Sequence, residues 1–171
     1  MMIDRLLLWI LLFTSGCTFG QATLTPAKID SIVTNLRSRN DLSYFTEKAY
    51  IAYNTLQKEE IVFLDTYSYD SLRNELAVVY SPSDPGKSTD IKNAHTGGFF
   101  TFYFSHNQLI KAYYTYFTGR DRHVDEFYFP APNKEQLQKS IPQQEEEDLL
   151  KAECLRRSLE HLRMFNKRGK E

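Results

Sequence analysis

Apolar residues near the start of the chain recur at helical spacing and predict two helices. Thr25 and Pro26 are residue types favoured where a helix begins. The apolar positions that follow them at helical spacing are Ile29, Ile32, Val33 and Leu36. A second helical pattern runs from Leu42 to Leu56, where one side carries Phe45, Ala49, Ala52, Tyr53 and Leu56.

Beyond Glu60 the pattern changes, because β-branched and aromatic residues dominate and predict a run of antiparallel strands. The predicted strands are Ile61–Tyr67, Leu76–Tyr80, Phe99–Phe104, Leu109–Thr118 and Val124–Phe129. Turn-forming residues separate several of them, and Asn107 is suited to the positive φ of a tight hairpin. Ser81–Gly98 is rich in Ser, Pro, Asp and Gly, so we expect a long loop there.

The last part of the chain returns to helical spacing over Gln143–Phe165. Acidic residues lie at the start of this segment and basic residues toward its end, as the helix dipole favours. Its apolar stripe consists of Leu149, Ala152, Leu155, Leu159 and Leu162. We therefore predict one α+β domain over residues 23–171, with N-terminal helices, an antiparallel β-meander of about five strands and a C-terminal amphipathic helix.

Residues 1–22 are expected to be a signal segment for export rather than part of the fold. Arg5 precedes the apolar run Leu6–Phe13 and small residues follow it, which is the order found in secretory signals. The run is shorter than the ~20 apolar residues that a membrane-spanning helix needs. The expected location of the mature protein is therefore periplasmic or extracellular.

Two cleavage sites remain open within this segment. Gly20–Ala22 has small residues at both positions that a signal peptidase reads, which would start the mature chain at Thr23. Thr14–Cys17 resembles the lipobox of bacterial lipoproteins. That resemblance implies removal of residues 1–16, diacylation of Cys17 and attachment to a membrane through this lipid alone.

Charge and cysteine content exclude several classes of function. The formal net charge is −1 with no basic stripe, so we expect no nucleic-acid partner. With Cys17 removed or lipidated, Cys154 is the only thiol left, and we expect no internal disulfide. Ser81–Thr89 ends like a phosphate-binding loop, but it lacks the first glycine and two prolines remove backbone N–H groups. We assign no catalytic residue, cofactor or metal site.

Aromatic residues gather in Phe99–Phe129, and strand parity sorts them onto two faces. The expected core face holds Phe100, Phe102, Phe104, Ile110, Ala112, Tyr114 and Tyr116. The opposite, mixed face carries the four residues that we predict to bind a protein or peptide partner, namely Tyr103, Lys111, Tyr113 and Phe117. The alternative is that the C-terminal helix covers this mixed face.

The leading functional hypothesis is a non-enzymatic exported envelope protein, a binding or accessory module that uses the aromatic sheet face. One alternative is an accessory subunit that docks through its C-terminal helix, in which case Leu155 and Leu159 would be exposed. The other alternative is a small hydrolase-like enzyme of the envelope. That activity requires a pocket that holds at least two titratable groups with shifted pKa values.

Overall fold

The computed structural model describes residues 24–54, 58–83, 98–130 and 146–169. In chain order the elements are helix α2 (Pro26–Ser38), strands β1 (Ser43–Asn54), β2 (Glu59–Asp70), β3 (Glu75–Pro82), β4 (Gly98–Ser105), β5 (Gln108–Thr118) and β6 (Asp121–Tyr128), and helix α4 (Glu146–Arg168). The strands form one six-stranded antiparallel sheet in the order β1-β2-β3-β4-β5-β6. The predicted α+β class, with a strand meander and a C-terminal helix, is confirmed.

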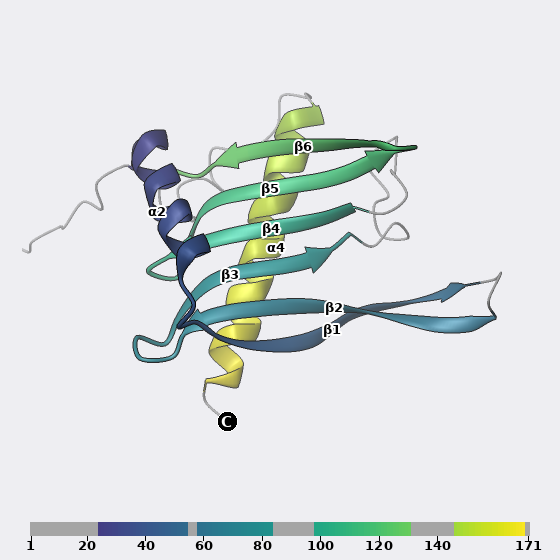
Figure 1. Ribbon diagram of the computed structural model, residues 1–171, viewed down its shortest axis with the longest axis horizontal. Coiled ribbons are helices and arrows are strands. Elements are labelled where there is room, and N and C mark those ends of the chain that lie inside the picture. The colour runs from purple at the N-terminus through teal and green to yellow at the C-terminus, as the bar shows by residue number, and fades with distance from the viewer. Residues whose placement is uncertain (1–23, 55–57, 84–97, 131–145, 170–171) are drawn as a thin grey trace, which may run out of the picture.

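The two helices lie on opposite faces of the sheet (Figure 1). α4 runs diagonally behind the strands, whereas α2 lies at the left end of the other face. Thr25 caps α2, since its hydroxyl accepts a hydrogen bond from the backbone N–H of Lys28 at 3.4 Å. Ile29 and Val33 on the buried side of α2 pack with Val78 of β3.

The face beneath α4 holds the main hydrophobic core. Phe102 and Phe104 are fully buried there, and α4 contributes Leu150, Leu155, Leu162 and Phe165. Cys154 and Ser158 are also fully buried, and their small side chains allow the helix to approach the sheet closely. Burial raises the pKa of the Cys154 thiol to about 12. The apolar side of α4 is therefore part of the core.

The predicted helix over Leu42–Leu56 is wrong, because Ser43–Asn54 form the edge strand β1, and the sheet consequently has six strands. A β-bulge between Lys48 and Tyr50 explains the misleading spacing. The extra residue moves the later inward positions by one, so that they resemble the three- and four-residue spacing of a helix.

A second bulge overturns the predicted position of Ile110. Tyr103 of β4 pairs with Lys111, whereas Phe104 pairs with Leu109, so Ile110 is the extra residue. Ile110 consequently packs beneath α2 instead of sharing the core face with Ala112.

The tight turn between β4 and β5 is confirmed. His106 and Asn107 both have positive φ, 51° and 56°, as a two-residue hairpin turn requires. The Asn107 side chain also accepts a hydrogen bond from the backbone N–H of Leu76 at 2.9 Å. Most of the predicted loop Ser81–Gly98, with its Gly-Lys-Ser sequence, lies outside the described residues, as does the whole signal segment.

Candidate functional site

The strand register places all four predicted binding residues on the α2 side of the sheet, but at different depths. Tyr103 pairs with Lys111, and Tyr113 and Phe117 follow at alternate positions of β5. α2 covers the first part of this face, where Tyr103 and Lys111 are buried. Tyr113 is half-buried and Phe117 is 41% exposed. The mixed face is thus partly covered by α2, not by α4.

Lys111 is a buried cation that joins three elements. Its ammonium forms ion pairs with Asp30 of α2 and Glu126 of β6, although the Lys111 side chain is only 3% exposed. It also donates a hydrogen bond to the Tyr128 hydroxyl at 2.9 Å. Burial alone would lower the pKa of Lys111, but the hydrogen bonds with Asp30 and Glu126 more than offset burial and raise it. Lys111 is therefore charged and connects α2 to the sheet.

Tyr103 takes part in a second connection between α2 and the sheet. Arg37 Nε donates a hydrogen bond to the Tyr103 hydroxyl at 2.8 Å. The Arg37 guanidinium lies 5.2 Å from the ring centroids of both Tyr103 and Tyr113, within the range of a cation–π contact. These contacts give Tyr103 and Tyr113 a structural role beneath α2.

Beyond α2 the same face of the sheet has no helix over it among the described residues (Figure 1). Tyr80 of β3 pairs with Thr66 of β2 and with Thr101 of β4, so these three residues point to the same face of the sheet. Every second residue along each strand from these positions points to that face as well, except where a bulge intervenes. We call this region the open sheet face and define it by its exposed apolar side chains, Ile51, Val62, Leu64, Tyr80, Phe117 and Val124.

Of the four predicted binding residues, only Phe117 belongs to the open sheet face. Tyr80 and Val124 were missed, although both lie in strands that the sequence predicts. Parity within β3 and β6 alone does not show which of the two faces a helix leaves uncovered, so no sequence signal singled them out.

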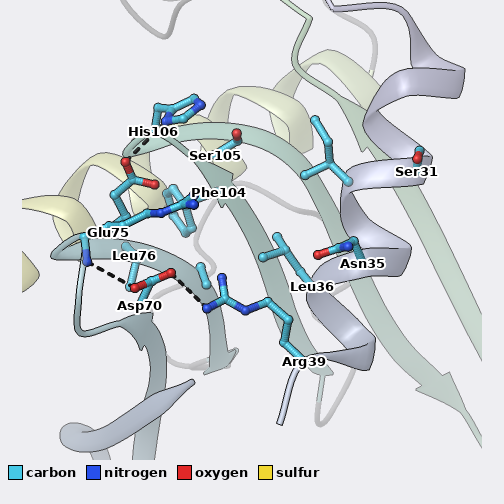
Figure 2. A pocket seen from close by; sticks show the side chains of 13 residues that line it. Ser31, Asn35, Leu36, Arg39, Asp70, Glu75, Leu76, Phe104, Ser105 and His106 are labelled. Atoms are coloured by element: carbon cyan, nitrogen blue, oxygen red, sulfur yellow. Dashed lines mark hydrogen bonds and ion pairs between the residues drawn. The ribbon is translucent and has the colours of Figure 1, made fainter. Parts of the chain in front are cut away.

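A pocket of about 320 Å³ lies between the end of α2 and the turns that follow β2 and β4 (Figure 2). Two pairs of polar groups face each other in it, Arg39 with Asp70 and His106 with Glu75. Asp70 accepts hydrogen bonds from Arg39 Nη2 at 2.8 Å and from two backbone N–H groups of the following turn at 3.1 Å. His106 Nδ1 lies 3.2 Å from the Glu75 carboxylate. These contacts hold the turn and the end of α2 in place, so we assign them a structural role.

A second cleft, of about 280 Å³, lies on the α4 side of the sheet. It is lined by Ala49, Tyr50, Asp65, Ser81, Pro82, Arg156, Arg157, Glu160 and His161. Strands β1, β2 and β3 supply one wall and α4 supplies the other. The sequence analysis gave Asp65 and His161 no role, because they meet only when α4 packs across the sheet.

Burial shifts the titration of two groups in this cleft. Desolvation raises the pKa of Asp65, whose Oδ1 is buried without a hydrogen-bond partner in the described structure. Burial, aided by the positive charge of Arg157, lowers the pKa of His161 to about 4. Neutral His161 Nδ1 lies 2.8 Å from the Tyr67 hydroxyl and 4.0 Å from Asp65 Oδ2. One pocket therefore holds two titratable groups with shifted pKa values.

The low pKa of His161 predicts that the protein loses stability in mild acid. The unfolded chain takes up this proton near pH 6.5, whereas the folded protein takes it up only near pH 4. Between these values the unfolded state binds more protons, so the free energy of unfolding falls as the pH falls, by up to about 3 kcal/mol. We expect urea unfolding at pH 7 and pH 4.5 to show a smaller difference for His161→Gln than for the natural protein.

The exposed His106 provides the control for this measurement. His106→Gln serves this purpose because it removes an exposed histidine that does not line the cleft. Equal pH dependence in all three proteins would show that His161 titrates normally in the fold. The raised pKa of Asp65 acts in the opposite direction, since it makes the folded state hold a proton more strongly.

Comparisons with known proteins do not assign a function to the chain, so its function has to be inferred from the geometry. Among the described residues, no three His, Cys, Asp or Glu side chains lie close enough together to hold a metal ion. Within the same ranges, no helix is both long and apolar enough to cross a bilayer. The chain matches no family model, no curated protein and no solved structure.

Proposed function

We propose that the chain is a non-enzymatic exported binding module that docks a protein partner on its open sheet face. The observation that supports this proposal is that six exposed apolar side chains, contributed by five strands, share one side of the sheet. Exposed apolar side chains that gather on one side of a sheet favour an interaction site.

The chemistry of the open sheet face favours a protein as the occupant. Thr66, Thr101 and Thr115 lie on the same side, where Thr101 and Thr115 are buried, and carboxylates are scarce there. Interface cores are depleted of charged residues and enriched in aromatic ones. Glu126 at the border of the face is already paired with Lys111, so it needs no cationic partner.

The two alternative functions receive less support. Docking through α4 would need an exposed apolar stripe, yet Leu155 is buried and Leu159 is half-buried against the sheet. Hydrolysis would need a nucleophile bonded to a base. In the α4-side cleft the Ser81 hydroxyl bonds to Asp65, whereas His161 bonds to Tyr67, so these residues do not form the Ser–His pair that activates a serine nucleophile. The cleft therefore favours binding over nucleophilic catalysis.

Export predicts that the protein isolated from cells is shorter than the full chain. We expect intact-mass measurement of the envelope form to show loss of residues 1–22, or loss of residues 1–16 with a diacylglyceryl group on Cys17. Full-length protein in the cytoplasm would contradict the export proposal. The two truncated masses distinguish the two peptidases.

Site-specific photo-crosslinking tests the docking proposal in the cells that make the protein. A photoreactive phenylalanine analogue is placed at Tyr80 or at Phe117 on the open sheet face. The matched control carries it at Leu72, which is 97% exposed but lies in the β2–β3 turn. We expect both face positions to give the same discrete crosslinked protein and Leu72 to give none.

A charge on the open sheet face should abolish this crosslink without unfolding the protein. Val124→Asp, combined with the analogue at Tyr80, is expected to reduce the product severalfold while the free energy of unfolding changes by less than ~1 kcal/mol. The proposal fails if the product persists, or if Leu72 gives the same product. A crosslinked product of twice the chain mass would show that the occupant is a second copy of this chain and not a different protein.

A further inference from the structure

The cleft between α4 and strands β1–β3 lies on the face opposite the proposed docking surface and is independent of it. Its volume of about 280 Å³ fits a small molecule and excludes a folded partner. Tyr50 forms a fixed wall, because its ring stacks on Phe63 with a centroid distance of 4.5 Å and its hydroxyl donates to the Ser83 carbonyl at 2.9 Å.

The charged residues of α4 around this cleft compensate one another. Arg156 pairs with Glu153 at 2.6 Å and with Glu160 at 2.5 Å. Arg157 Nε lies 2.9 Å from the Glu153 carboxylate. These two cations and two anions leave no net charge on the helical wall. The sheet wall adds Asp65, and His161, whose Nδ1 lies 4.0 Å from Asp65 Oδ2, is neutral.

Asp65 consequently has no charged partner in direct contact, although the charge of Arg157 acts on it from a longer range. Its side chain is 14% exposed, and its Oδ1 has no hydrogen-bond donor among the described residues. Glu47, directly opposite on β1, has the same sign and is paired with Arg168. A buried carboxylate oxygen without a donor is destabilising, and a ligand that brings a donor would relieve that cost.

We propose that this cleft binds a small ligand through a primary ammonium group, which donates a hydrogen bond to the Asp65 carboxylate. An ammonium carries three donors and a positive charge, so it supplies both of the things that Asp65 lacks. Ser81 also lines the cleft, and because its hydroxyl hydrogen already bonds to Asp65, its oxygen is free to accept a second ammonium hydrogen. The aromatic wall of Tyr50 suits the alkyl part of such a ligand.

The test titrates the purified protein with n-butylammonium chloride at pH 8. Binding is measured from the changes in the amide NMR chemical shifts. Two matched probes separate charge from hydrogen bonding: n-butanol lacks the charge, and tetramethylammonium lacks the donors. We expect saturable shifts at residues that line the cleft for n-butylammonium only. Saturable binding of n-butanol or tetramethylammonium with equal affinity would overturn the proposal, as would no binding of n-butylammonium at 50-fold excess.

Asp65→Asn is the decisive variant, because it keeps the shape of the side chain and removes its charge. We expect it to weaken binding roughly tenfold or more, as loss of a charged hydrogen bond does. Asp41→Asn, which changes an exposed carboxylate beside Arg39, should bind like the natural protein. Unchanged affinity in Asp65→Asn would refute the proposal. If that variant does not fold, Ser81→Ala is expected to weaken binding and takes its place.

The pH dependence of binding gives a readout that a purely structural role of Asp65 would not produce. The groups that face Asp65 are Glu47, Ser81, Arg157 and His161, with Tyr67 bonded to His161. Desolvation raises the pKa of Asp65, so n-butylammonium should bind more tightly as the pH rises and this carboxyl ionises. Binding that is independent of pH between 4 and 8 would count against Asp65 as the receptor group.

Discussion

Phe102→Ala should cost about 3–5 kcal/mol in the free energy of unfolding, the range found for buried aromatic residues cut to alanine. Phe102 is fully buried at the centre of the core beneath α4. Its ring stacks on Phe100 at a centroid distance of 5.7 Å and lies 5.4 Å from the His161 ring. Removing the ring opens a cavity in the core beneath α4.

Phe117→Ala is the matched control, since it removes the same side chain from the open sheet face. Phe117 is exposed and supports no other element, so we expect a change of less than about 1 kcal/mol. Denaturant unfolding of the two variants, measured side by side, shows whether the two substitutions differ in their loss of stability. Equal losses would mean that the open sheet face is core, and the docking proposal would then have no surface to act on.

The sequence predicted most strands well because their signals are local. Each hairpin turn after β2, β4 and β5 carries residues suited to positive φ, and these are Asn74, His106, Asn107 and Gly119. Alternation then assigned Phe100, Phe102 and Phe104 to one face. Where alternation failed, at β1 and at Ile110, a bulge had inserted one residue, and a bulge has no clear signature in a single sequence.

The choice of which helix covers which face could not be predicted from parity. Parity shows which residues share a face, but both helices have apolar stripes of suitable length. The stripe on α4 was also partly misplaced: Leu149 is 45% exposed, whereas the polar residues Ser158 and His161 are buried. Ser158 fits because its hydroxyl donates to the Leu155 carbonyl at 2.8 Å, which satisfies it within the helix.

The α4-side cleft lay beyond sequence analysis for a related reason. Asp65 comes from β2, Ser81 from the end of β3 and His161 from α4, and only the packing of α4 brings them together. An Asp at an inward position of a strand is a local inconsistency that a sequence does reveal. Sites that conflict with their local pattern are where function is expected.

Lys111→Met should be the second most damaging substitution, with an expected loss of about 3 kcal/mol. The methionine retains an apolar stem of similar length, so the change mainly removes the buried ammonium. Asp30 and Glu126 then face each other without a cation, and breaking a buried ion pair by removing one partner costs ~3–5 kcal/mol. We place the loss at the low end because both carboxylates are partly exposed and retain some solvation.

A compensating variant separates the charge effect from loss of packing. The pKa values of Asp30 and Glu126 are both lowered, chiefly by their hydrogen bonds with Lys111, so without Lys111 these carboxylates lose that stabilisation while their repulsion remains. Asp30→Asn with Glu126→Gln in the Lys111→Met background should therefore recover more than half of the lost stability, whereas the same two changes beside natural Lys111 should destabilise the protein. Denaturant midpoints of the complete set of variants measure this coupling. If the compensating changes add their own losses to that of Lys111→Met, then Lys111 connects α2 to the sheet through packing alone and not through its charge.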